Sequence, residues 1–165
     1  MNAVLEAGTP ATELRAALRD FYDDYAGALD DLDLDRWVEF FTEDCHYRVI
    51  SQENARAGLP LGLIYCMNKN MLRDRVTAIR ETTVYEPRQL RHFVSGVRIN
   101  RSEDDIIHAQ ANFMVVESLS DQEPTVNLVG LYKDIIVRNE SGFALKSRDC
   151  IYDNYRIRNS LIIPV

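Results

Sequence analysis

The sequence has 165 residues, 46% of them hydrophobic, and carries 19 basic and 26 acidic side chains for a formal net charge of −7. This length and hydrophobic content suffice for one domain with a sizeable core. The acidic balance argues against binding to nucleic acid or to an anionic membrane, because such surfaces attract basic proteins.

Three cysteines, Cys45, Cys66 and Cys150, stand at wide spacings. An odd number at such spacings favours reduced, buried thiols over a disulfide framework. The first residues lack the basic region and apolar core of a signal peptide. The sequence also contains no run of 18 successive apolar residues, the length that would span a membrane. We therefore expect a soluble, cytoplasmic protein.

In chain order, residues 1–9 are expected to form a flexible arm, and a first helix is expected to run to about Leu29. The apolar residues of this helix recur with a period of 3.6. They are Leu14, Ala17, Leu18, Phe21, Tyr22, Tyr25, Ala28 and Leu29. The acidic run over residues 30–35 is interpreted as a solvated turn that caps the next helix, because it lacks the ligand spacing and glycine of a calcium loop.

A short second helix is expected around Trp37, the only tryptophan, and it should lead directly into a strand. Trp37, Phe40 and Phe41 stand at i, i+3 and i+4, which would place three aromatic rings on one helix face. From Cys45 to Val49 the period becomes two, which is typical of a strand. A third helix is expected from about Ile64 to Ile79, after a loop over residues 51–63.

Beyond residue 85 the pattern becomes that of a sheet. Four runs rich in β-branched and aromatic residues, 91–100, 106–119, 125–139 and 143–157, predict long strands, and the short loops between them predict antiparallel hairpins. In the second run, Ile107 to Val115 alternate with polar residues. In the third, Val129, Leu131, Ile135 and Val137 share a face that Lys133 interrupts, so its register is less certain.

Helices followed by a curled sheet predict one α+β domain over residues 1–165, a cone with three N-terminal helices packed on an antiparallel sheet. Residues 161–165 form an apolar C-terminal tail with no expected strand partner. An exposed apolar tail indicates a contact with another chain.

The sequence lacks the motifs of a cofactor site. A Rieske cluster needs Cys-x-His and Cys-x-x-His pairs, and none of the three cysteines is followed by a histidine at either spacing. The histidines His46, His92 and His108 fall on three expected strands, whereas non-haem iron needs two histidines and a carboxylate at one point. Phosphate-binding glycine loops and the Gly-x-Ser-x-Gly elbow are also missing. We expect no metal or cofactor in this chain.

A general acid–base site inside the cone stays open as an alternative, because a buried carboxylate and histidine there would have shifted pKa values. Its candidate catalytic residues are His92, Asp44 and Asp149, with His46, Tyr22 and Tyr47 as further members. Each of the first three also has a structural interpretation: a hydrogen-bonded strand histidine, a helix-to-strand turn, and one half of an ion pair.

Four stretches are similar to a known family. They are residues 37–47 (WVEFFTEDCHY), 71–76 (MLRDRV), 91–96 (RHFVSG) and 151–165 (IYDNYRIRNSLIIPV). They resemble the small, or beta, subunit of aromatic-ring-hydroxylating dioxygenases, the Rieske non-haem iron oxygenases, over nearly the whole chain from Leu14. The resemblance is closest to small subunits of the salicylate 5-hydroxylase and terephthalate dioxygenase types, which share Gly-Leu-Pro at 58–60 and Arg-Asp-Arg at 73–75.

The resemblance implies a nuclear-transport-factor-2-like, or cystatin-like, cone and a hexamer of three large and three small subunits. In it the large, or alpha, subunit holds the Rieske 2Fe–2S cluster, the mononuclear iron and the substrate pocket. This chain would be the noncatalytic, structural small subunit of an oxidoreductase of aromatic compound catabolism, a homotrimer within the hexamer. The second hypothesis is a free-standing dehydratase, isomerase or cyclase of the same fold, using the His and Asp candidates above.

Overall fold

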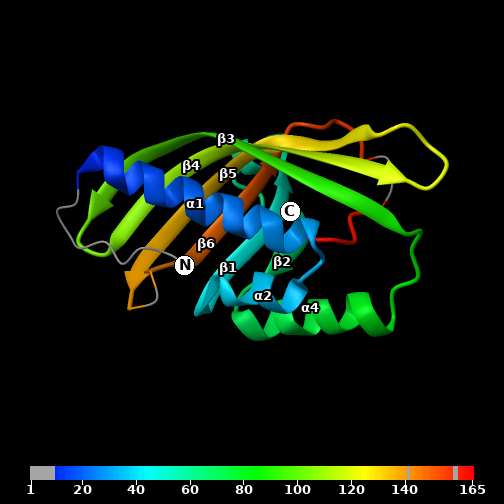
Figure 1. Ribbon diagram of the computed structural model, residues 1–165, viewed down its shortest axis with the longest axis horizontal. Coiled ribbons are helices and arrows are strands. Elements are labelled where there is room, and N and C mark those ends of the chain that lie inside the picture. The colour runs from blue at the N-terminus through cyan, green and yellow to red at the C-terminus, as the bar shows by residue number, and fades with distance from the viewer. Residues whose placement is uncertain (1–9, 141, 158–159) are drawn as a thin grey trace.

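The computed structural model describes residues 10–140, 142–157 and 160–165 (Figure 1). The arm expected over residues 1–9 lies outside these ranges. The elements in chain order are α1 (Ala11–Asp30), α2 (Leu34–Glu39), β1 (Phe41–Ser51), α3 (Gln52–Arg56), β2 (Gly62–Cys66), α4 (Lys69–Glu81), β3 (Arg88–Glu103), β4 (Ile106–Leu119), β5 (Thr125–Asn139) and β6 (Gly142–Tyr152).

The six strands form one curved sheet in the order β2-β1-β6-β5-β4-β3, and α1 lies across its concave face, mainly against β3 (Figure 1). All neighbouring strands are antiparallel except β1 and β6, which run parallel. The expectation of a wholly antiparallel sheet is wrong at this one pair. It rested on the short hairpin loops, which connect only the successive strands β3, β4, β5 and β6. The strand β1 pairs with β6 from a distant part of the sequence, so no hairpin loop sets their relative direction.

The first helix is confirmed: α1 ends at Asp30, and its apolar side is buried under the sheet. The acidic turn caps the next helix as expected, since the backbone N–H of Arg36 donates to Asp33 Oδ1 at 3.2 Å. Phe41, however, already belongs to β1. Trp37 therefore meets Phe41 and Tyr47 across the helix–strand corner, edge to face, with ring centroids 5.3 and 5.4 Å from that of Trp37.

The third expected helix begins later than predicted. Residues 62–66 form β2, in which Ile64 and Cys66 are buried while Leu63 and Tyr65 are exposed. Gly62 allows the close pairing with β1. A Cβ at this position would lie 2.7 Å from the carbonyl oxygen of Val49 and would clash with it. The helix α4 starts only at Lys69, after Asn68 accepts a capping hydrogen bond. Part of the expected loop over residues 51–63 forms α3.

The core fills the concave side of the sheet. The alternation in β4 is confirmed, because Ile107, Ala109, Ala111, Phe113 and Val115 are all buried. The tail is also part of this core: Ile163 and Val165 are buried, so the expectation of an exposed apolar tail is wrong. The tail folds back under its own sheet, where the N–H and oxygen of Val165 and the carbonyls of Leu161 and Ile162 are hydrogen-bonded.

Candidate functional site

The three candidate catalytic residues lie on separate elements with separate partners. His92 is on β3 with its side chain fully buried, and its Nδ1 lies 2.7 Å from Asp30 Oδ1 at the end of α1. The backbone N–H of His92 donates to the same oxygen at 3.0 Å. This geometry is that of a strand histidine that anchors a helix end.

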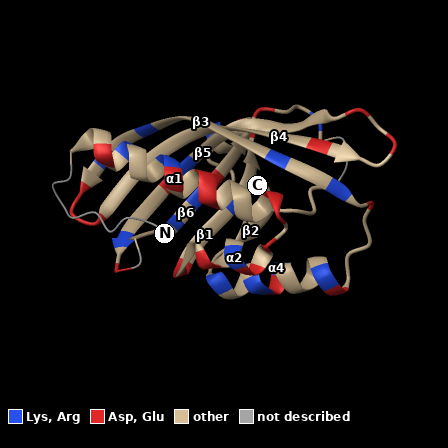
Figure 2. Cartoon of the chain, in the orientation of Figure 1, with Lys and Arg blue, Asp and Glu red and all other residues tan. Residues whose placement is uncertain are grey.

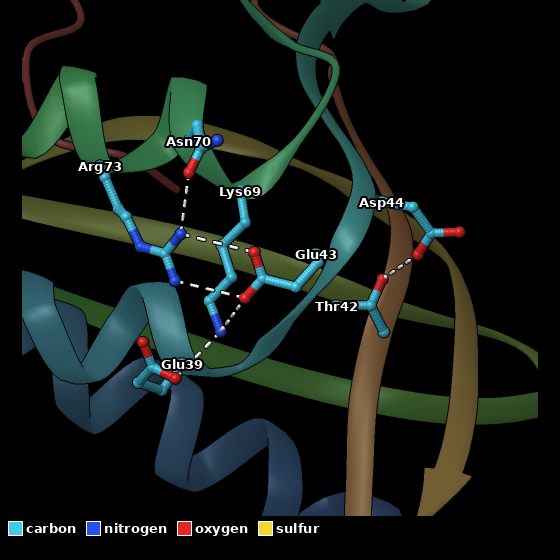
Figure 3. Close-up of polar contacts among 7 residues, drawn as sticks. All are labelled: Glu39, Thr42, Glu43, Asp44, Lys69, Asn70 and Arg73. Carbon is cyan, nitrogen blue, oxygen red and sulfur yellow. Dashed lines mark hydrogen bonds and ion pairs between the residues drawn. The ribbon is translucent and has the colours of Figure 1, made fainter.

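The two candidate carboxylates lie away from His92. Asp44 is exposed on β1 and accepts a hydrogen bond from Thr42 Oγ1 at 2.9 Å (Figure 3). This bond, with Lys146 nearby, lowers the pKa of Asp44. Asp149, on β6, accepts two hydrogen bonds from Arg48, from Nε at 2.6 Å and from Nη2 at 2.7 Å. No pair among the three candidates shares a hydrogen bond in the part of the chain that the structure describes.

The histidines and cysteines do not fit an iron site either. His46 packs edge to face on Tyr65 at 5.0 Å, whereas His92 points to the concave side of the sheet. Cys45, Cys66 and Cys150 are free, buried thiols. Within the described ranges no three His, Cys, Asp or Glu side chains gather in a way that could hold a metal ion. Neither the Rieske cluster nor the mononuclear iron has a ligand set there.

The concave face instead holds a buried group of polar side chains, of which the sequence analysis named only Tyr22 and Tyr47 as candidate site residues. We call it the inner polar cluster, and its members are Tyr22, Tyr25, Tyr47, Tyr132, Asp134, Arg148 and Cys150. The register of the strands assembles it, because Asp134 of β5 lies opposite Arg148 of β6, and Tyr132 lies opposite Cys150. The tyrosines of α1 cover the group from the other side.

An ion pair forms the centre of the inner polar cluster. Arg148 donates to both carboxylate oxygens of Asp134, from Nε at 3.0 Å and from Nη2 at 2.7 Å, and both side chains are fully buried. The guanidinium lies over three aromatic rings, 4.0 Å from the centroid of Tyr25, 4.2 Å from that of Tyr132 and 5.1 Å from that of Tyr22. Tyr22 OH donates to Asp134 Oδ2 at 2.6 Å.

The tail enters the same cluster. The backbone oxygen of Val165 accepts from Tyr25 OH at 2.7 Å, from Tyr47 OH at 3.1 Å and from Cys150 Sγ at 3.5 Å. The backbone N–H of Val165 donates to Tyr47 OH at 2.9 Å. Outside the cluster, Arg75 of α4 holds the beginning of the tail through its Nη2, which donates to the carbonyls of Leu161 at 3.1 Å and Ile162 at 2.8 Å.

Burial controls the protonation of the cluster. It raises the pKa of all four tyrosines, and for Tyr22 the Asp134 carboxylate adds to the effect. Burial likewise raises the pKa of the Cys150 thiol. For Arg148 burial alone would lower the pKa, but Asp134 and the neighbouring tyrosines raise it overall. The hydroxyls and the thiol therefore stay protonated at neutral pH, so each is able to donate a hydrogen bond.

Little space remains beside the tail. The gap between the tail and strands β3 to β5 has a volume of about 10 Å³, and Arg88, Leu90 and Val115 line it together with the tail. A volume of this size holds about one water molecule. The concave face thus has no room for a substrate at this point while the tail is in place.

A second polar group ties α4 to the helix–strand corner (Figure 3). Lys69 is buried and lies 2.9 Å from Glu39 Oε2 and 3.8 Å from Glu43 Oε1, while Arg73 Nη2 lies 3.2 Å from Glu43 Oε1. The acidic partners are exposed. Acidic and basic residues occur along both α1 and α4 (Figure 2). These contacts position α4 and have no geometry suited to catalysis.

Exposed apolar side chains gather at the free edge of the sheet. We call them the apolar ridge, formed by Leu61, Leu63, Tyr65, Met67 and Met71. Leu61 and Met67 are 67% and 60% exposed. Because β2 is the first strand in the sheet order, its outer edge has no strand partner among the residues that the structure describes. An apolar surface on an unpaired edge is typical of a contact with another chain.

A smaller apolar surface lies on the convex face of the sheet. We call it the outer patch, formed by Phe93, Met114 and Val129, which stand side by side in the register of β3, β4 and β5. Phe93 is 53% exposed.

Among the described residues no helix is both long enough and apolar enough to cross a membrane.

A family model and two curated relatives all describe small, or beta, subunits of ring-hydroxylating enzymes. Residues 25–159 match the model of a family described as ring hydroxylating beta subunit. The chain is 41% identical, over 86% of its length and 88% of the relative, to the anthranilate 1,2-dioxygenase small subunit of Burkholderia cepacia. It is 30% identical, over 86% of its length and 92% of the relative, to a beta subunit of the terminal oxygenase component of terephthalate 1,2-dioxygenase from Comamonas sp..

A solved structure agrees with these relatives. It is a beta subunit assigned to an aromatic-ring-hydroxylating dioxygenase of Novosphingobium aromaticivorans, with a TM-score of 0.86 and 36% identity over 94% of this chain and 99% of that one. Two more distant solved structures, 22% and 18% identical to this chain with TM-scores of 0.67 and 0.65, show similarity of fold alone. The nuclear-transport-factor-2-like cone expected from the sequence is confirmed.

Proposed function

The chain belongs to the family of ring-hydroxylating beta subunits, and we propose that it is the noncatalytic, structural partner within its enzyme. It is the small subunit of an aromatic-ring-hydroxylating dioxygenase, an oxidoreductase. One observation carries the structural role: the concave face, where a cone fold would enclose a substrate, is filled by the inner polar cluster and the tail. The separate positions of His92, Asp44 and Asp149 support the same conclusion.

The iron groups of the enzyme are assigned to the large subunit. This chain has no ligand set for them in its described residues. When bound, such groups supply oxygen activation and electron transfer, which the residues of this chain could only support by holding the assembly together. Three free thiols, all buried, suit a reducing compartment, and we assign the enzyme to the cytoplasm.

The proposed assembly is a trimer of small subunits within a hexamer of three large and three small subunits. The apolar ridge is assigned to the large subunit. Contact between two copies through the free edge of β2 would be two-fold and self-complementary, which does not suit a three-fold ring. The outer patch is then the contact between neighbouring small subunits, since the tail, buried under its own sheet, is not free for that role.

A charge placed on each surface tests these assignments. Leu63→Glu should lower recovery of the large subunit with the tagged small subunit at least tenfold and leave the small-subunit trimer intact. Phe93→Glu should instead weaken the trimer. Val84→Glu is the matched control, because Val84 is fully exposed outside both surfaces and should change neither. Loss of the trimer with Leu63→Glu would reassign the apolar ridge to contacts between small subunits, and no effect would refute its role.

The substrate is proposed to be an aromatic carboxylic acid. Support comes from the two relatives described above, whose names refer to anthranilate and terephthalate. The complete enzyme, co-expressed with its large subunit and electron-transfer partners, should hydroxylate a benzoic acid derivative in preference to naphthalene. Faster turnover of naphthalene than of every acid offered would contradict this class.

A further inference from the structure

The inner polar cluster is more polar than a structural core requires. A fully buried ion pair such as Asp134–Arg148 generally adds no stability over apolar residues of the same size. Two donors of the cluster, Arg148 Nη1 and Tyr132 OH, are buried and have no hydrogen-bond partner within the described structure. Unpaired buried donors beside a charged group are more typical of a binding site than of a packed core.

The tail shows what the cluster holds. Three donors, Tyr25 OH, Tyr47 OH and Cys150 Sγ, converge on one oxygen, that of Val165. All three stay protonated because burial raises their pKa values. The valine side chain is buried beside them. The group held by the cluster is therefore an oxygen acceptor attached to a small apolar group, the valine side chain.

We propose that the inner polar cluster is a carboxylate-binding site that the chain's own tail occupies, and that a small carboxylate with an apolar body binds there when the tail withdraws. A carboxylate has two oxygens and about four acceptor positions. One oxygen takes the place of the Val165 oxygen. The second provides an acceptor for the unpaired donors Arg148 Nη1 and Tyr132 OH. With the tail in place, these two donors have no hydrogen-bond partner within the described structure.

Arg75 provides a way to release the tail without changing the site. Its guanidinium lies on α4 and holds the carbonyls of Leu161 and Ile162, whereas the donors of the site lie on α1, β1, β5 and β6. Removing this side chain weakens the attachment of the tail at its beginning. The inference does not depend on the subunit role of the chain.

The single tryptophan provides a built-in signal, because the Trp37 ring lies 5.4 Å from that of Tyr47. We would titrate benzoate into the full-length Arg75→Ala variant and follow Trp37 fluorescence, with toluene as the uncharged probe of similar shape. Benzoate should bind saturably and at least tenfold more tightly than to the unchanged chain, and more tightly than toluene. A second variant that ends at Ser160 should bind benzoate more tightly still.

Two further measurements make the test specific. Tyr25→Phe in the Arg75→Ala background should weaken benzoate at least tenfold and leave toluene unchanged. The peptide Leu-Ile-Ile-Pro-Val should displace benzoate from the chain that ends at Ser160. If Arg75→Ala binds benzoate no better than the unchanged chain, or if toluene binds as well as benzoate and Tyr25→Phe has no effect, the proposal is wrong. If the shortened chain does not fold, the Arg75→Ala result decides alone.

Discussion

Removing one half of the buried ion pair should cost far more stability than removing both halves. Asp134→Leu leaves the Arg148 guanidinium charged, fully buried and without its two hydrogen bonds. Breaking a buried pair in this way costs about 3 to 5 kcal/mol. Adding Arg148→Met removes the stranded charge, and replacement of a whole buried pair by apolar residues is often neutral or stabilises by about 1 to 4 kcal/mol. The double variant should therefore recover most of the loss.

Equilibrium denaturation in urea, followed by Trp37 fluorescence, measures these free energies of unfolding. The Arg48–Asp149 pair is the matched control, because its side chains are 27% and 19% exposed and solvent screens the charge that remains. Asp149→Leu should cost only about 1 kcal/mol. If the double variant at positions 134 and 148 were as unstable as Asp134→Leu alone, lost packing rather than the unpaired charge would be the cause, and the reasoning would fail.

Three further predictions concern the core and the cofactors. Trp37→Ala should destabilise by about 3 to 5 kcal/mol in the same assay, because Trp37 is fully buried, and a loss below about 1 kcal/mol would show that the ring is not part of the core. The four tyrosines of the inner polar cluster should ionise only on unfolding: their raised pKa values mean that stability is intact below pH of about 10 and then falls by about 1.4 kcal/mol per pH unit for each of them. Absorbance at the tyrosinate band should thus rise in two steps, whereas one smooth step for all eight tyrosines would place the cluster in solvent. Elemental analysis of the chain purified alone should find no stoichiometric iron, and about one iron per chain would overturn the assignment of iron to the large subunit.

The sequence predicts local structure well where one periodicity dominates. The helical period up to Leu29 and the alternation from Ile107 to Val115 both correspond to buried faces. Prediction fails where two patterns overlap. Residues 64–66 continue into a helical period, yet Gly62 and the pairing of Ile64 with Val49 make them a strand. A pairing between distant segments leaves no local signal.

The inner polar cluster shows the same limit at the level of the site. In β5 the apolar residues Val129, Leu131 and Ile135 suggest one face, but that face is convex and partly exposed. Tyr132 and Asp134 share the buried face. Side chains two residues apart in a strand lie on the same face, so the spacing of Tyr132 and Asp134 is a signal in the sequence for this buried pair. The partner Arg148 and the tail could not be found in this way, because only the order of the strands and the path of the last residues bring them together.

The subunit role itself is tested most directly by native mass spectrometry of this chain co-expressed with its large subunit. The account predicts one complex that contains three copies of each chain, and iron should leave with the large subunit when the two are separated. A small subunit that stays apart from the large one, or that converts a substrate when purified alone, would contradict it.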